Sequence, residues 1–444
     1  MSQNKEADIK FSAWDYTRPD YSEVKKKIND CKNRMHNAMS YQTFRDECNM
    51  IAAASGYRNE LEQEFGKQVF ALIDQHRAAE NSDSMRLQAE ESALKMQYRK
   101  LMVKNIHDDE ELYQVFQKLI KIRCELADSL GYNSYIDLGY HIQGRRDYGI
   151  REITDFRRNI QKYVTPAVAD IKTKGIDFDY PPAVAANSGE LISAISAMFK
   201  DLSYEAGSYI QEMTKKELYD LETRANKRNN LFTCCMLPYE KLPFIIGNYT
   251  GDGMETGYAV HEFGHGFAFY TAAGKQPLYE LHRSSPAVNE IHSKTMEHFM
   301  FPYLNMFVGE HQKEYIRNHL MQQLENLVYR CAIDEFEHLM YDRNMSRVQL
   351  CELWADISNR YMPWNRISLE DIHQGKCWPR QTHIVESPFY YIQYDIAQIS
   401  TYEFYYKMKS NYEQAWSDYM RLCSAGGNKS YLELLETAHL SNYL

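Results

Sequence analysis

The sequence predicts a mainly α-helical protein with two helical lobes and one small β element. Apolar residues recur at three- and four-residue steps over long stretches, which is the spacing of one face of a helix. These stretches cover residues 21–55, 58–79, 84–105, 109–130 and 150–173, and the same pattern returns from residue 310 to the end. A β pattern is confined to two short runs, so we expect helices to build most of the core.

The clearest interruption of the helical pattern lies between residues 174 and 189. Gly175, Pro181, Pro182 and Gly189 fall within these residues, and such a composition is typical of a long loop between structural units. We therefore expect an N-terminal helical lobe over residues 1–175 and a second region, which carries the functional site, over residues 190–444.

The β pattern follows further helical segments near residues 190–220. Residues 231–236 and 244–249 are short runs of aromatic, β-branched and other apolar residues, separated by Pro238 and Pro243. The second run leads through a glycine-containing turn into the segment discussed next. Such a strand could offer an exposed edge to an extended peptide, with Gly247 and Asn248 as contacts; a simple hairpin explains the pattern equally well.

The segment His261-Glu262-Phe263-Gly264-His265 is the most informative stretch of the chain. Residues 256–273 lack proline, are rich in Ala, Phe and Tyr, and precede Gly274, which suits the end of a helix. In a helix, His261 and His265 lie one turn apart on the same face, as two ligands of one zinc ion require. Glu262 lies beside that face, where it could hold a water as general base.

A third ligand is expected because catalytic zinc usually takes three protein ligands. Residues 288–299 read as a second helix that begins after Ser284-Ser285-Pro286. Glu290 lies in its first turn and is the predicted third ligand, although a carboxylate there also suits the helix dipole. Glu297, two turns later, is predicted to orient a ligand histidine, with a surface ion pair as the alternative. His292 and His298 are expected to play no part in metal binding.

Together these residues resemble the zinc peptidases of family M3, the group of thimet oligopeptidase and oligoendopeptidase F. The resemblance rests on HEFGH followed by NEIHSKTMEHF, and it extends to HIVESPFYYIQY at residues 383–394 and GGNKSYLELL at residues 426–435. Leu130-Gly131-Tyr132 and Arg146-Asp147-Tyr148-Gly149 are also similar to oligoendopeptidase F relatives. The chain departs from the family in a short N-terminal part and in residues 227–233, where relatives carry a glycine-rich turn.

The resemblance implies a helical zincin-type fold whose two lobes enclose a channel, with one Zn²⁺ per chain and short unstructured peptides as substrates. It also implies catalytic roles for His383 and for tyrosines of the segment at residues 389–394. An oxyanion needs a hydrogen-bond donor opposite the metal, and a tyrosine hydroxyl suits that task. We expect Tyr394 to be this donor, with Tyr391 and then Tyr390 as alternatives; Tyr390 is also a candidate substrate contact.

Composition limits the possible partners and compartment. The formal net charge of −10 argues against binding to nucleic acid, whose phosphates need basic partners. Nine cysteines occur without a CxxC pair, which favours a reducing compartment over a disulfide scaffold. The first eight residues contain no apolar stretch of a secretory signal, and no apolar run is long enough to span a membrane. A cytoplasmic protein is therefore expected.

Two other functions agree with the same motif. A helical metallocarboxypeptidase would share HExxH and the later Glu, and it would need a cation such as Arg366 or Arg380 to hold the C-terminal carboxylate of its substrate. A zinc-containing protein that binds peptides without cleaving them is the second alternative. No Cys lies near the motif to complete a structural zinc site, and Glu262 is present, so hydrolysis is the favoured reading.

Overall fold

A computed structural model describes residues 67, 82–103, 109–175, 179–224, 227, 232–237, 240–276, 279–341, 345–379 and 381–444. The predicted helices at residues 21–55 and 58–79 lie outside these ranges, apart from residue 67. The described part is dominated by helices, so the mainly α-helical prediction is confirmed. Among the described residues, no helix is both long and apolar enough to cross a membrane.

Most N-terminal helices form where the apolar spacing predicts them. These are α6 (Ser82–Val103), α7 (Asp109–Ser129), α9 (Ile150–Asn159) and α10 (Thr165–Thr173), and a π-helical turn at Ile160–Val164 joins the last two. A further helix, α8 (Tyr135–Ile142), lies between the predicted stretches. The side chain of Ser134 accepts a hydrogen bond from the Asp137 amide and thereby caps α8. The predicted helix over residues 150–173 is thus present but changes its winding at its centre.

Two helices and a small sheet follow the loop. These elements are α11 (Ser188–Leu202), α12 (Tyr204–Lys215), β1 (Tyr219–Asp220), β2 (Phe232–Leu237) and β3 (Leu242–Gly247). The strands have the order β1-β3-β2, in which β3 pairs parallel with β1 and antiparallel with β2.

The strand order corrects one expectation. The strand that precedes the HEFGH segment is β3, for which the sequence allowed either an exposed edge open to a peptide or a simple hairpin. It is instead the central strand of the sheet, and every residue of Leu242–Gly247 is buried. A central strand is covered on both faces, which explains its continuous apolar sequence. The edge next to the functional site belongs to β2.

The remaining helices run from residue 253 to the C-terminus. They are α13 (Gly253–Ala273), α14 (Pro286–Phe299), α15 (Leu304–Val308), α16 (Gln312–Tyr341), α17 (Arg347–Tyr361), α18 (Leu369–His373), α19 (Thr382–Glu386), α20 (Gln393–Ser410), α21 (Tyr412–Ala425) and α22 (Tyr431–Thr437). Short 3₁₀ turns occupy Tyr279–His282, Phe301–Tyr303 and Gly309–His311.

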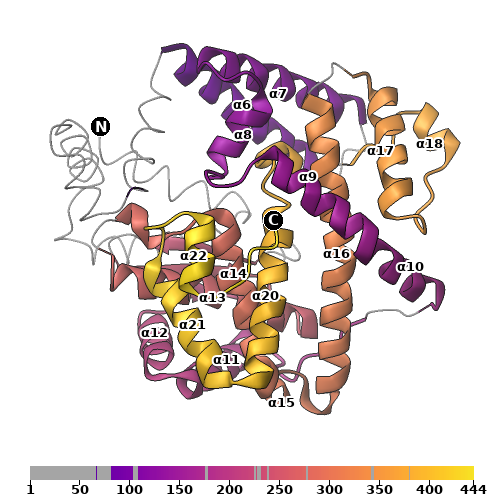
Figure 1. Ribbon diagram of the computed structural model, residues 1–444. Helices are drawn as coiled ribbons and strands as arrows, with labels where there is room; N and C mark the ends of the chain where they lie inside the picture. The colour runs from indigo at the N-terminus through magenta and orange to yellow at the C-terminus, as the bar shows by residue number, and fades with distance from the viewer. Residues whose placement is uncertain are drawn as a thin grey trace.

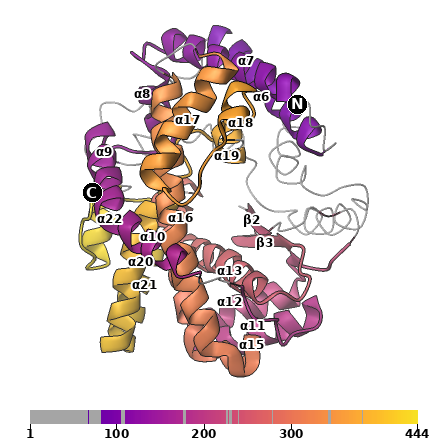
Figure 2. The ribbon, with the colours of Figure 1, turned by 90° about the vertical axis from the view of Figure 1, so that its right-hand side faces the viewer.

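The helices gather at two ends of the molecule. Helices α6, α7, α8, α17 and α18 lie at one end, and α11, α12 and α15 lie at the other (Figures 1 and 2). The 30-residue helix α16 runs between the two ends and contacts α8, α9, α10, α17 and α20. Helix α14 packs between α13 and α20, with nearly all of its residues buried, and this trio forms the core around the site.

Candidate metal centre

Helix α13 presents the HEFGH segment, and its start is fixed by a capping box. Asp252 caps the helix by accepting a hydrogen bond from the Met254 amide at 2.7 Å, while the Glu255 carboxylate accepts one from the Asp252 amide at 3.4 Å and another from the Thr250 amide at 2.6 Å. The helix begins at Gly253, three residues before the predicted start, and it ends at Ala273, directly before Gly274, as predicted.

Helix α14 brings the third predicted ligand to α13 because Gly264 allows the two helices to approach closely. A Cβ atom at Gly264 would lie 2.7 Å from the Met296 Cβ and 3.1 Å from the Ser293 Cα of α14. The middle glycine of HEFGH therefore serves helix packing. Pro286 is the first residue of α14, where its fixed φ and missing N–H are tolerated.

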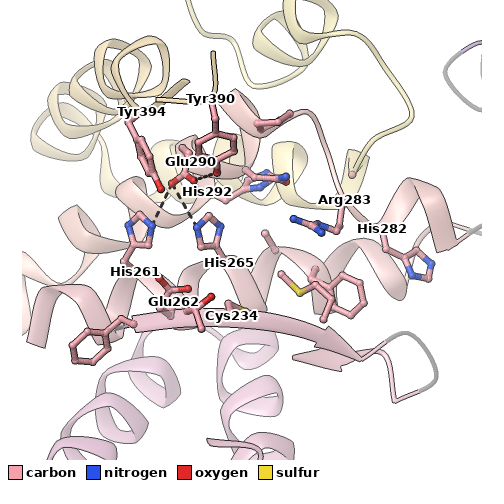
Figure 3. Close-up of a pocket in the computed structure, with 18 residues that line it drawn as sticks. Cys234, His261, Glu262, His265, His282, Arg283, Glu290, His292, Tyr390 and Tyr394 are labelled. Atoms are coloured by element: carbon pink, nitrogen blue, oxygen red, sulfur yellow. Dashed lines mark hydrogen bonds and ion pairs between the residues drawn. The ribbon is translucent and has the colours of Figure 1, made fainter. Parts of the chain in front are cut away.

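Glu290 lies directly opposite the two histidines (Figure 3). Its Oε2 is 3.3 Å from the His261 Nε2 and 3.5 Å from the His265 Nε2, and one donor atom from each residue lies within 4.8 Å of the others. Donors arranged tetrahedrally at about 2.0–2.1 Å from zinc lie about 3.3 Å apart. Two imidazoles and one carboxylate also form a common catalytic zinc set, so these residues fit the ion that the motif implies.

Tyr390 fixes the orientation of the Glu290 carboxylate. Its hydroxyl donates a hydrogen bond to Glu290 Oε1 at 2.6 Å, which leaves Oε2 to face the histidines. Glu290 is only 2% exposed, so its charge depends on these neighbours. Burial would raise the pKa of the Glu290 carboxyl, but the two histidines lower it well below its usual range. The carboxylate is therefore ionised, as a metal ligand must be.

The ring of His261 is held from its far side by Glu297. Glu297 Oε1 lies 2.6 Å from His261 Nδ1, so the other ring nitrogen faces Glu290. Burial would raise the pKa of Glu297, but the hydrogen bond to His261 and the charge of Lys294 lower it to about 2. The second oxygen of Glu297 lies 3.2 Å from the Nε2 of His319 on α16. A carboxylate behind a ligand histidine is the usual way to fix its tautomer and ring orientation.

Glu262 is on the side of α13 that faces β2, close to but apart from the donor atoms (Figure 3). It lines the same cavity as His261 and His265, and it is only partly buried. Burial raises the pKa of its carboxyl above the usual range, although the two histidines oppose the rise. A raised pKa makes a glutamate a better proton acceptor, which suits a general base.

The cavity around these residues has a volume of about 270 Å³. Besides the three donor residues and Glu262, its described lining comprises Phe232, Thr233, Cys234, Met236, Ala268, Phe269, His282, Arg283, Pro286, Asn289, His292, Tyr390, Tyr394 and Gly426. Four of them belong to β2, so the edge strand forms one wall. Gly247 and Asn248, predicted as substrate contacts, are not among the lining residues.

Two of the predicted tyrosines reach the cavity and one does not. Tyr390 and Tyr394 line it, with ring centroids 5.5 Å apart, whereas Tyr391 lies outside the lining. Tyr391 and Tyr394 would share one face if the whole stretch were helical. However, α20 begins only at Gln393, and residues 387–392 form turns in which Phe389 has φ +62°.

His383 lies next to Tyr390 and Tyr394 but outside the cavity lining. Its ring stacks on Tyr391 at 4.4 Å and lies 6.0 Å from the rings of Tyr390 and Tyr394. The Nε2 of Gln381 lies 3.0 Å from the His383 Nδ1. His383 is not among the residues that line the cavity, so its catalytic role stays a prediction.

The turn before Tyr390 is anchored by buried polar side chains from α16 and from the segment that follows α8. The Phe389 amide donates a hydrogen bond to Glu337 Oε1 of α16 at 3.0 Å, and the Phe389 carbonyl accepts one from Arg145. The Gln143 side chain donates to the Pro388 carbonyl at 2.9 Å. Sequence reasoning missed these anchors because nothing local marks residues so distant in the chain as partners.

Sequence reasoning also missed parts of the cavity wall. Arg283 precedes α14, and Thr233 and Cys234 lie on β2, but none of them belongs to a short motif. Asn289 belongs to the NEIHSKTMEHF segment, but it was not singled out as part of the site. For β2, the continuous apolar pattern of β3 could have identified β3 as central and its partner as the edge. His292 lines the cavity as well, and burial lowers its pKa to about 3, so it is neutral.

Comparison with known sequences agrees with the motif. The sequence model of peptidase family M3 matches residues 203–442, more than half of the chain. The chain is 25% identical over 244 residues to the oligopeptidase PepF of Bacillus subtilis (strain 168). That alignment covers 53% of this chain and 36% of the relative, so the matched part spans about a third of the relative's length.

Solved structures resemble the whole described arrangement. PZ peptidase A, solved with an inhibitor, matches with a TM-score of 0.81 and 27% identity over 89% of this chain and 80% of that chain. A proposed oligoendopeptidase F from Bacillus anthracis str. Ames matches with a TM-score of 0.77 and 26% identity over 89% and 79%. Metallocarboxypeptidase 1 of Trypanosoma cruzi shares the fold at 14% identity, with a TM-score of 0.67 over 97% and 92%. From the family match and this shared fold, we conclude that the chain belongs to peptidase family M3.

Proposed function

We propose that the protein is a zinc-dependent endopeptidase that hydrolyses internal bonds of short, unstructured peptides. The observation that carries this proposal is the convergence of His261, His265 and Glu290 on one point, with Glu262 beside them in a cavity next to an edge strand. A zinc ion held there would supply the Lewis acidity that polarises a peptide carbonyl and acidifies the attacking water.

Glu262 is the proposed general base and, later in the reaction, the general acid. Its carboxylate takes the proton from the attacking water and later gives it to the leaving nitrogen. Its partial burial and raised pKa support this role, because the carboxyl must accept and release a proton near neutral pH. Glu297 supports the reaction indirectly, since it keeps the His261 ring in the orientation that metal binding needs.

Tyr394 is the proposed donor to the oxyanion. It lines the cavity, and its hydroxyl makes no hydrogen bond to a described candidate ligand, whereas the Tyr390 hydroxyl donates one to Glu290. Burial holds the pKa of the Tyr394 phenol well above its usual range, so it stays protonated and able to donate. We assign Tyr390 to orienting Glu290 and contacting substrate, and we propose that His383 and Tyr391 hold the two cavity tyrosines in place.

The substrate class follows from the wall formed by β2. Backbone groups on an edge strand can pair with an extended peptide, and only an unfolded segment can present its backbone in this way. Relatives named as oligopeptidases support the same reading. Cytoplasmic location remains an expectation from the cysteine pattern.

The carboxypeptidase alternative is supported by one observation, a cation in the cavity. That cation is neither of the two expected from the sequence. Arg366 is exposed and does not line the cavity, and Arg380 lies outside the described residues. Arg283 lines the cavity instead.

The test is mass spectrometry of a mixed peptide library incubated with zinc-loaded wild type, Glu262→Gln and the exposed-site control Glu310→Gln. We expect internal cuts by wild type and by Glu310→Gln, and none by Glu262→Gln at an unchanged zinc content. Release of single residues from one end would replace the endopeptidase proposal with a carboxypeptidase. Cleavage by Glu262→Gln would refute the assigned base, and no cleavage by any protein would favour peptide binding without turnover.

A further inference from the structure

Arg283 lines the cavity that contains the three candidate metal ligands. It directly follows the 3₁₀ turn Tyr279–His282, and its guanidinium points toward the donor residues (Figure 3). Among the described residues that line the cavity, it is the one Arg or Lys. We propose that Arg283 is a subsite for a substrate carboxylate close to the scissile bond, an inference that rests on the proposed peptidase function.

The backbone around Arg283 is held rigidly. The Gly427 amide donates to the Leu281 carbonyl at 2.8 Å, and the Ser284 hydroxyl donates to the Gly426 carbonyl at 2.6 Å. On the other side, the Asn289 side chain accepts from the Ser284 amide at 3.1 Å and donates to the Ser284 carbonyl at 3.0 Å. The segment is thus tied both to the end of α21 and to the first turn of α14.

Gly426 makes the first of these ties possible. It has φ +53°, and a Cβ there would collide with the Leu281 carbonyl oxygen. Only glycine combines this conformation with so close an approach. The glycine pair that follows α21 therefore helps to fix the position from which Arg283 reaches the cavity.

Arg283 itself has no hydrogen bond or ion pair with another side chain in the described part of the structure. The carboxylate of Glu290 is engaged by the two histidines and Tyr390. A guanidinium presents a planar fork of donors that matches a carboxylate in geometry and charge. A rigidly presented, unpaired arginine in a substrate cavity is therefore suited to receive a carboxylate from the substrate.

The position of Arg283 along β2 relates it to a bound peptide. At the start of β2, the Phe232 ring lies 5.9 Å from the Tyr258 ring, on the N-terminal side of His261. The strand that carries Cys234 runs past the donor residues toward the side of the cavity on which Arg283 lies (Figure 3). A peptide paired with β2 would thus pass the metal centre and reach Arg283 on the side of the C-terminal half of β2.

Two substrate groups share the required chemistry, the C-terminal carboxylate and an acidic side chain. A test needs one peptide in four forms. Each form has either Glu or Gln at one chosen position and either a free or an amidated C-terminus, and the chosen position is varied along the peptide. We would measure kcat/KM for zinc-loaded wild type, Arg283→Gln and the control Arg151→Gln, an exposed arginine of α9 outside the cavity. In parallel, calorimetry would give Kd for the same peptides with zinc-loaded Glu262→Gln, with and without Arg283→Gln.

We expect one carboxylate to improve both kcat/KM and Kd about tenfold or more over its amide form, as a charge-assisted hydrogen bond does. Arg283→Gln should bring that ratio close to one, while Arg151→Gln should keep it. Loss of the effect on C-terminal amidation assigns the terminal carboxylate, and loss on Glu-to-Gln exchange assigns the side chain. Equal values for all four peptides, or a preference that survives Arg283→Gln, would overturn the inference. If no peptide is cleaved, the peptidase proposal fails, yet the Kd ratios still decide the role of Arg283.

Discussion

Replacing Gly264 by Ala tests whether the close approach of α13 and α14 builds the metal centre. The added Cβ would lie 2.7 Å from the Met296 Cβ, whereas carbon atoms in contact prefer about 3.5–4.0 Å. The two helices must therefore separate locally by about 1 Å. Because Glu290 is on α14 and both histidines are on α13, this separation moves the third ligand away from the other two.

The expected magnitudes follow from this displacement. Overpacking a tight core contact costs about 1–3 kcal/mol in free energy of unfolding, and the better helix propensity of Ala returns about 1 kcal/mol. Zinc sites tolerate errors in ligand distance of only about 0.2 Å, so a shift several times larger should weaken zinc affinity tenfold or more. Metal binding should therefore suffer more than stability.

The assay is zinc affinity from competition with a chelator, together with denaturant unfolding of the metal-free protein. Gly207→Ala is the matched control, because a Cβ at this helical position of α12 would meet its nearest neighbour at 3.4 Å, an ordinary contact. It should leave zinc affinity unchanged. Zinc affinity of Gly264→Ala equal to that of wild type would refute the view that this helix contact positions Glu290.

Three further substitutions probe the centre and its supports. Glu290→Ala should abolish stoichiometric zinc binding, measured by metal analysis after dialysis; full zinc content would mean that another group is the third ligand. Glu297→Gln should retain the ion but weaken zinc affinity about 10- to 100-fold, because His261 loses its charged partner; an unchanged affinity would make Glu297 a bystander. Burial raises the pKa of Glu337 to about 8, so wild type should lose stability as pH rises from about 5 to 8, the range in which the unfolded glutamate is ionised and the folded one is not. Glu337→Gln, which keeps an acceptor for the Phe389 amide, should flatten this slope in urea unfolding, with a remainder from Asp395, whose pKa burial also raises to about 8; parallel slopes for both proteins would contradict the assignment.

Sequence patterns were sufficient for elements whose structure depends on local residues. The segments around HEFGH and NEIHSKTMEHF form helices because their caps and apolar spacing are local, and α13 differs from its predicted range only by one N-terminal turn. The strand order was not predictable in the same way. It depends on the two-residue strand β1, whose pairing with β3 joins residues distant in sequence.

The site shows the same division between local and distant causes. The donor geometry of His261 and His265 follows from helix periodicity alone, and Glu290 follows once α14 is recognised. Tyr391 lies outside the cavity lining, and the turn at Phe389 that precedes it is held by Glu337 of α16 and by Arg145 of the segment after α8. Such distant partners leave no local signal in the sequence. Arg283 went unnoticed because its placement depends on a loop more than a hundred residues further along the chain.

The most direct test of the account is a crystal structure of the zinc-loaded protein with anomalous diffraction recorded at the zinc edge. The account predicts one anomalous peak per chain, about 2.0–2.2 Å from His261 Nε2, His265 Nε2 and a carboxylate oxygen of Glu290, with Glu262 outside bonding distance. A peak bonded to Glu262, or a peak elsewhere in the chain, would contradict it.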